Sequence, residues 1–236
     1  MEYVLCQPAD GFRGYYYARK TQKKRITLHF TAGYLPGDIA SLTNKKRGHV
    51  SVPFVIARDG TIYQLFPSSE WSYHLGPGAR GTNESMSKSS IGIELSNIGY
   101  LVEKEGNLET VYSRLLNEET GNEGPVKIYC SLNDHEAYQK ISQPYREHVY
   151  FATFTSAQYD SLAILLRYLS GTYQVPLAFL PEEKRYKIFS TAKEAINYRG
   201  VCSHVNFRGV GKWDIGPAFD WDRLIQAVSA HVVGMV

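Results

Sequence analysis

The sequence predicts an α/β fold in which a central mixed β-sheet is flanked by helices. Three segments alternate apolar and polar residues and two more have apolar residues at helical spacing: 25–32, 50–66, 90–96, 156–170 and 220–232. Strands that are separated by such helices pack in layers around one sheet. The 236 residues suffice for a hydrophobic core. We therefore expect a single domain over 1–236, with an N-terminal extension at 1–24 and an insertion at 100–150.

The first two extended segments carry clear strand signals. Residues 25–32 read RITLHFTA, and their alternation places the apolar side chains on one face and His29 on the other. Residues 50–66 contain the turn signal RDGT between two β-branched runs, which predicts a hairpin. Pro53 is expected at an edge or a bulge, because proline cannot donate to a strand ladder.

The third strand and the helices follow. In residues 90–96, SIGIELS, the alternation places Glu94 on the polar face. The charged, glycine- and asparagine-containing stretch at 100–150 predicts loops and short strands. Thr155 and Gln158 have the spacing of a capping box, which marks the start of the helix at 156–170.

Composition excludes several classes of protein. The net charge of +3 suits an anionic polymer, and there is no basic tail that would indicate a nucleic-acid partner. Three cysteines without a CxxC pair predict neither a disulfide framework nor a structural zinc knot. No apolar run is long enough to span a membrane, and no signal peptide is recognised. We expect no membrane partner, and a cytoplasmic location or release by lysis or a dedicated secretion route.

A histidine and an aspartate near the C-terminus are candidates for chemistry. His204 precedes Asp214 by ten residues, and Lys212 lies two residues before the aspartate. Taken alone, the histidine fits a core or surface position, and the aspartate before Ile-Gly-Pro fits a turn. The spacing alone therefore leaves the assignment open.

Six segments follow the order of motifs in one family. They are TLHFTAG (27–33), HVSVPFVIARDGTIYQLFP (49–67), WSYHLG (71–76), SIGIELSN (90–97), FTSAQYDSLAILLRYL (154–169) and SHVNFRGVGKWDIGPAFDWDRL (203–224). With them the chain resembles the zinc-dependent N-acetylmuramoyl-L-alanine amidases, whose superfamily includes phage and bacterial amidases and the animal peptidoglycan recognition proteins. The resemblance covers most of residues 27–224 apart from the insertion.

The resemblance implies a zinc site and its catalytic neighbours. His29, His204 and Asp214 match the family's Zn²⁺ ligands, and three protein ligands leave a fourth position open, as a hydrolytic zinc requires. Glu94 matches the catalytic glutamate that acts as general acid and base. Lys212 matches a lysine whose cation stabilises the oxyanion.

Further matches are expected to contact substrate. His74 matches a histidine that lines the cleft, with Trp71 nearby; holding the loop is the alternative role. Asn97 follows the catalytic strand and is a candidate donor to a peptide carbonyl. Cys202 is expected to be a small buried apolar residue.

The sequence also departs from the family pattern. Pro53 stands where many relatives have a histidine, and Val52 occupies a site that is tyrosine in one branch; relatives without that tyrosine use a glutamate, which Glu94 supplies here. The insertion has no family counterpart and is expected to form a substrate wall, a lid or a surface for a protein partner. Its histidines, His135 and His148, are expected at the surface.

The function implied is hydrolysis of the amide between N-acetylmuramic acid and L-alanine in peptidoglycan or muropeptides. Two alternatives stay open. One is a peptidoglycan-binding module without catalysis, and the other is an amidase that acts as a toxin or lytic effector. The sequence does not choose between polymeric wall and soluble anhydro-muropeptide as substrate.

Overall fold

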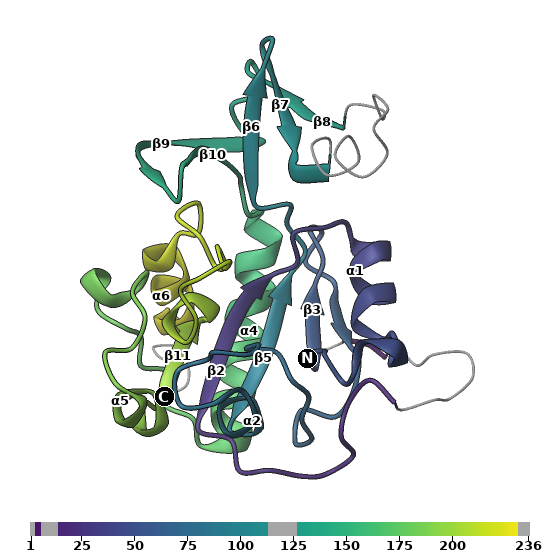
Figure 1. Cartoon of the computed structure of the whole chain (residues 1–236), viewed down its shortest axis with the longest axis vertical. Coiled ribbons are helices and arrows are strands. Elements are labelled where there is room, and N and C mark those ends of the chain that lie inside the picture. Colours follow the sequence, from purple (N-terminus) through teal and green to yellow (C-terminus); the bar gives the residue numbers. More distant parts are fainter. Residues whose placement is uncertain (1–2, 6–13, 113–126, 231–236) are drawn as a thin grey trace.

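The computed structural model describes residues 3–5, 14–112 and 127–230 and confirms the α/β class (Figure 1). A six-stranded mixed sheet has the order β1-β4-β3-β5-β2-β11. Its strands are β1 (Val4–Leu5), β2 (Arg25–Phe30), β3 (Phe54–Ile56), β4 (Ile62–Gln64), β5 (Ser90–Leu95) and β11 (Gly200–Ser203). Strands β3, β5, β2 and β11 run parallel, whereas β4 is antiparallel to β3.

The predicted strands form the middle of this sheet. β2 and β5 pair along their whole length and are buried on both faces. The predicted hairpin is β3 and β4, joined by a turn in which Gly60 donates to the carbonyl of Ala57. The prediction of an edge or a bulge for Pro53 is wrong, because β3 lies between β4 and β5 and pairs with both without a register shift. The proline directly precedes the strand, where its missing N–H is tolerated.

Five helices and three 3-10 turns surround the sheet within the described part of the chain. They are α1 (Leu35–Leu42), α2 (Asn83–Lys88), α4 (Ser156–Tyr173), α5 (Ala192–Asn197), α6 (Trp221–Ser229), η1 (Lys45–Arg47), η2 (Glu182–Lys184) and η3 (His204–Asn206). The predicted capping box of Thr155 and Gln158 begins α4. Asp220 caps α6, and the predicted extension to 232 falls partly outside the described residues. No described helix has the length and apolar character to cross a bilayer.

Apolar layers cover both faces of the sheet. One face packs its isoleucines and leucines, among them Ile26 and Ile93, against Leu162 of α4 and Leu224 of α6. On the other face, Cys202 lies in a second cluster with Met86 of α2, buried as predicted. The segment predicted as an N-terminal extension is partly integrated, because β1 pairs with β4, and Tyr15 and Tyr16 are buried near α1.

The insertion forms a second, five-stranded antiparallel sheet with the order β8-β7-β6-β10-β9. Its strands are β6 (Tyr100–Lys104), β7 (Asn107–Thr110), β8 (Ile128–Ser131), β9 (Tyr138–Tyr145) and β10 (His148–Ala152). This second sheet lies above the carboxyl ends of β2 and β5 in Figure 1. The insertion is thus more regular than predicted, because a small apolar cluster with Leu101 and Leu108 supports one of its faces. Residues 113–126 of the insertion lie outside the described residues.

Candidate metal centre

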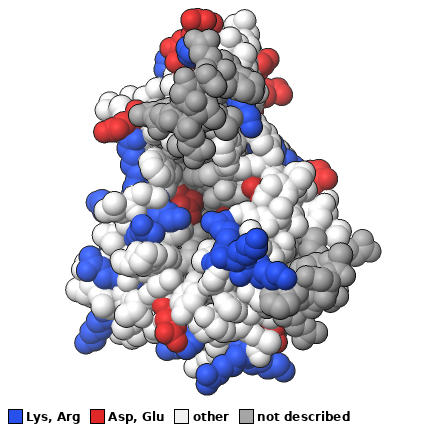
Figure 2. Space-filling model, turned by 45° about the vertical axis from the view of Figure 1, so that its right-hand side comes forward, with Lys and Arg blue, Asp and Glu red and all other residues white. Residues whose placement is uncertain are grey.

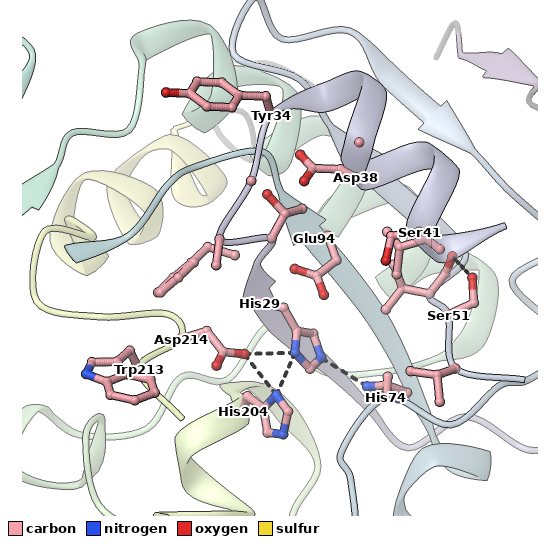
Figure 3. A pocket seen from close by; sticks show the side chains of 18 of the residues that line it. His29, Tyr34, Asp38, Ser41, Ser51, His74, Glu94, His204, Trp213 and Asp214 are labelled. Atoms are coloured by element: carbon pink, nitrogen blue, oxygen red, sulfur yellow. Dashed lines mark hydrogen bonds and ion pairs between the residues drawn. The ribbon is translucent and has the colours of Figure 1, made fainter. Parts of the chain in front are cut away.

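The carboxyl ends of the parallel strands bring four predicted site residues together. His29 lies near the end of β2, and Glu94 is its register partner on β5, so both side chains lie on the same face. His204 begins η3, directly after β11, and Asp214 follows in the loop before α6. Ligands of open α/β sheets bind at this end of the strands. Parallel pairing therefore explains why residues far apart in the sequence meet (Figure 3).

Three ligand atoms form a compact triangle. His29 Nδ1 lies 3.0 Å from His204 Nδ1 and 3.0 Å from Asp214 Oδ2, and His204 Nδ1 lies 2.9 Å from the same oxygen. Zinc bonds to nitrogen and oxygen of about 2.0–2.2 Å, in tetrahedral geometry, separate ligand atoms by about 3.3–3.5 Å. The triangle therefore has close to the size that a tetrahedral cation needs.

The tautomer of His204 favours a cation in this triangle. Its Nε2 lies 2.9 Å from the carbonyl oxygen of Leu75, and because a carbonyl only accepts, Nε2 carries the hydrogen. In the tautomer that has its hydrogen on Nε2, Nδ1 presents a lone pair to the Asp214 carboxylate, and the two lone pairs repel unless positive charge lies between them. A cation satisfies all three lone pairs, whereas a single proton bridges only two. A backbone carbonyl behind a histidine is also the usual support of a metal ligand.

The protonation states suit metal binding. All three residues are buried, with exposed fractions of 2% for His29, 2% for His204 and 6% for Asp214. Burial lowers the pKa of His29 to about 4, so its ring is neutral at neutral pH. Burial alone would raise the pKa of Asp214, but its interactions with His204 and His29 outweigh burial and hold this pKa well below its usual range. His29 therefore offers a neutral imidazole and Asp214 an ionised carboxylate, the forms that bind metals.

Glu94 lies beside the triangle as an unused carboxylate. Its Oε2 is buried and finds no hydrogen-bond partner among the described residues. Burial, and then the negative charge of Asp214, raise the pKa of Glu94 well above its usual range. A carboxyl group with a raised pKa in a cleft is suited to exchanging protons.

The centre opens into a cleft of about 730 Å³ between the α/β body and the second sheet. Its walls include Arg47, Lys127 and Lys212. Figure 2 shows the hollow below the second sheet, with acidic atoms on its floor and basic side chains beside it. The positive charge of Lys212 acts to lower the pKa of both His29 and Glu94, so the lysine is electrostatically coupled to the centre.

His74 contacts the ring nitrogen of His29 that is not part of the triangle. Its Nδ1 lies 3.0 Å from Nε2 of His29, and it lines the cleft. Gly92 makes this approach possible, because a Cβ there would lie 3.2 Å from His74 Nδ1 and 2.6 Å from Val52. The Nε2 of His74 has no partner within the described part of the chain. His74 thus both orients His29 and presents a free polar atom.

Two predicted substrate contacts lie elsewhere. Trp71 does not line the cleft; it is 5% exposed and stacks on Tyr17 with ring centroids 4.2 Å apart. Asn97 is 1% exposed, and its amide is consumed by hydrogen bonds to the backbone of Ala152, Thr153 and Gly99. Both residues hold the fold together in this structure, so their placement does not support direct substrate contact.

Asp38, Tyr112 and Trp213 are among the cleft residues that sequence reasoning missed. Asp38 is 6% exposed, accepts from the Ser96 hydroxyl at 2.7 Å, and has a pKa raised by burial. Acidic residues are common in the first turn of a helix, so the place of Asp38 in α1 gave no signal of a functional site. Trp213 stands between Lys212 and Asp214, and that adjacency was the available signal. Tyr112 lies in the insertion, two residues after β7, so no local pattern could place it.

The fold and the site together define a class: an α/β protein in which two histidines and an aspartate that could hold a metal ion lie buried beside a free carboxylate, the arrangement of metal-dependent hydrolases. The particular family follows from the sequence. Residues 19–217 match the family described as N-acetylmuramoyl-L-alanine amidase, and the chain belongs to this family.

Individual relatives agree with this assignment. A stretch of 81 residues, 33% of this chain, is 36% identical to N-acetylmuramoyl-L-alanine amidase AmiD of Escherichia coli (strain K12), and it spans only 29% of that protein. A crystal structure of AmpD has a TM-score of 0.54 at 19% identity and covers 97% of this chain and 95% of its own. The complex of E. coli AmiD with its substrate anhydro-N-acetylmuramic acid-L-Ala-D-γ-Glu-L-Lys has a TM-score of 0.53 at 22% identity, covering 94% of this chain and 65% of its own. The two solved structures establish likeness of fold.

Proposed function

We propose that this protein hydrolyses the amide bond between N-acetylmuramic acid and L-alanine of peptidoglycan or muropeptides. The observation that carries the proposal is the triangle of His29, His204 and Asp214 on the floor of a cleft, with the unpartnered Glu94 carboxylate beside it. Family membership supports the reaction. The substrate seen with the AmiD neighbour, an anhydro-muramyl peptide, supports a ligand of this chemical class.

The three residues of the triangle would hold Zn²⁺. Bound there, the ion supplies Lewis acidity, which lowers the pKa of water and polarises a carbonyl. The protein's own contribution is a dry, fixed ligand set: Leu75 fixes the ring of His204 and His74 contacts the ring of His29. Such supports orient the ligands and raise affinity for the metal.

Glu94 performs the proton transfers in this proposal. Its carboxylate takes the proton that the attacking water loses, and the resulting carboxylic acid delivers that proton to the leaving nitrogen of L-alanine. Burial favours the protonated form, which makes the second transfer accessible near neutral pH. General acid and base catalysis of this kind contributes about 10²–10⁴-fold.

The cations of the cleft complement the charges of substrate and transition state. Lys212 is placed to stabilise the negative oxygen that develops on the attacked carbonyl, because its charge reaches both His29 and Glu94. Arg47 and Lys127 line the cleft further out and favour the carboxylates of a stem peptide.

The test is incubation of the purified protein with intact sacculi and with a soluble anhydro-muropeptide, each with and without a chelator, followed by mass spectrometry. We expect free stem peptides that begin with L-alanine, their loss on chelation, and their return when zinc is added. The ratio of the two yields reports which substrate form is preferred. Tight binding without cleavage of either substrate would contradict the proposal and favour a recognition module.

A further inference from the structure

The residues that directly follow β7 of the second sheet contact one side of the cleft, at the segment after β2. The hydroxyl of Tyr112 donates to the carbonyl of Ala32 at 2.5 Å. Ala32 has a φ of 54°, in the left-handed region that residues with a Cβ rarely adopt. This bond supports an unfavourable backbone conformation three residues after His29.

The same sheet contacts the opposite side of the cleft at the segment that carries Lys212 and Asp214. Arg146, in the turn between β9 and β10, donates to the carbonyl of Gly209. Tyr100 of β6 stacks on His148 of β10 with centroids 3.7 Å apart, and its ring lies 5.4 Å from that of Trp213. His148, predicted at the surface, is therefore half-buried against Tyr100.

The contacted segment has little structure of its own. Residues 208–214 belong to no helix or strand, so their position depends on contacts with neighbouring elements. Trp213 lies between the predicted oxyanion stabiliser and the predicted metal ligand. A ring held at this position restrains both of its neighbours, because consecutive Cα atoms are only 3.8 Å apart.

We propose that the second sheet is a positioning element for the metal centre, in which Tyr100, stacked on His148, acts through Trp213 to hold Asp214 and Lys212 in place opposite His29. Tyr112, two residues after β7, contacts the other side of the cleft. Because β6 is hydrogen-bonded to both β7 and β10, one sheet connects the contacts on the two sides. The inference rests on the proposed metal site and assigns the insertion a role within the chain.

The test uses metal-free protein labelled with 5-fluorotryptophan. It compares three variants in β6, two at Tyr100 and one at Val102. Tyr100→Leu removes the ring between His148 and Trp213, and Tyr100→Phe retains it. Val102→Ala changes an exposed residue on the same strand and is the control. The readouts are the dissociation constant for Zn²⁺, measured against a competing chelator, and the ¹⁹F chemical shift of Trp213, assigned with Trp213→Phe.

We expect Tyr100→Leu to shift the Trp213 resonance and weaken zinc binding by about 10–100-fold, as for other residues that support metal ligands. Tyr100→Phe and Val102→Ala should stay within about twofold of the wild type. Should Tyr100→Leu fail to fold, Arg146→Gln removes the hydrogen bond to Gly209 from a turn and should weaken zinc binding in the same direction.

The proposal would be overturned if Tyr100→Leu moved the Trp213 resonance but left the affinity for Zn²⁺ unchanged. It would also be overturned if Val102→Ala lost as much affinity for Zn²⁺ as Tyr100→Leu. A wild-type protein that binds zinc but cleaves no muropeptide would count against the proposed function alone. Zinc affinity and the fluorine shift report on positioning without any substrate.

Discussion

Replacing Asn97 by alanine separates a structural role of its side chain from substrate contact. Nδ2 donates to the carbonyls of Ala152 at 3.3 Å and Thr153 at 3.1 Å, and Oδ1 accepts from the N–H of Gly99 at 2.7 Å. The carbonyl of Thr153 keeps a second donor, the guanidinium of Arg58. The substitution therefore removes the side-chain partner of two groups, the Ala152 carbonyl and the Gly99 N–H, around a residue that is 1% exposed. Each lost hydrogen bond costs about 1 kcal/mol, and a buried polar group that is left without a partner costs more. Asn97→Ala should therefore lower the free energy of unfolding by about 2–3 kcal/mol.

The assay is urea denaturation of the metal-free protein, together with KM for a soluble muropeptide at a temperature where the variant is folded. We expect KM to change by no more than about twofold, because the amide does not reach the cleft. Asn133→Ala, at an exposed position, is the matched control and should cost less than about 0.5 kcal/mol. Unchanged stability in Asn97→Ala with KM raised about tenfold would refute the reasoning and return Asn97 to the substrate site.

Three further predictions concern the site and its surroundings. Glu94→Gln should keep its metal and lose about 10²–10⁴-fold in turnover, because an amide cannot take up the proton; full turnover would exclude Glu94 as the acid-base group. Trp71→Leu should lower the free energy of unfolding by about 1–3 kcal/mol through lost contacts with Tyr17 and Tyr73, and a raised KM at unchanged stability would point back to substrate contact. Burial lowers the pKa of Lys23 to about 7, below its unfolded value near 10.4. The unfolded chain then binds more protons between these pH values, so the free energy of unfolding should rise from about pH 7 to about pH 10.5; Lys23→Met should remove that slope, which equilibrium denaturation at several pH values would measure.

The centre of the sheet was predictable from local patterns. Alternation in two short segments located β2 and β5 and placed His29 and Glu94 on their polar faces. Their pairing as register partners needed the parallel arrangement, which only the α/β pattern suggested. The capping box of Thr155 and Gln158 located α4 correctly because it is a purely local hydrogen-bond motif.

Elements that depend on distant contacts were missed. Helix α1 has Pro36 and Gly37 in its first turn, which weaken a helix signal although a proline there loses no hydrogen bond. β11 is four residues long and is stabilised by its pairing with β2, far away in the sequence. The insertion was predicted as loops and short strands, but the pairing of its strands into one sheet was not predicted, because charged outer positions obscure the alternation. Trp71 was predicted to contact substrate because its stacking on Tyr17 is not visible from the sequence.

The central claim is that His29, His204 and Asp214 bind one divalent metal ion. Calorimetric titration of the metal-free protein with Zn²⁺ tests it most directly. The geometry predicts one ion per chain in the wild type and loss of that binding in Asp214→Ala, with a folded chain verified by circular dichroism. An absence of zinc binding in the wild type, or undiminished binding in Asp214→Ala, would contradict the account.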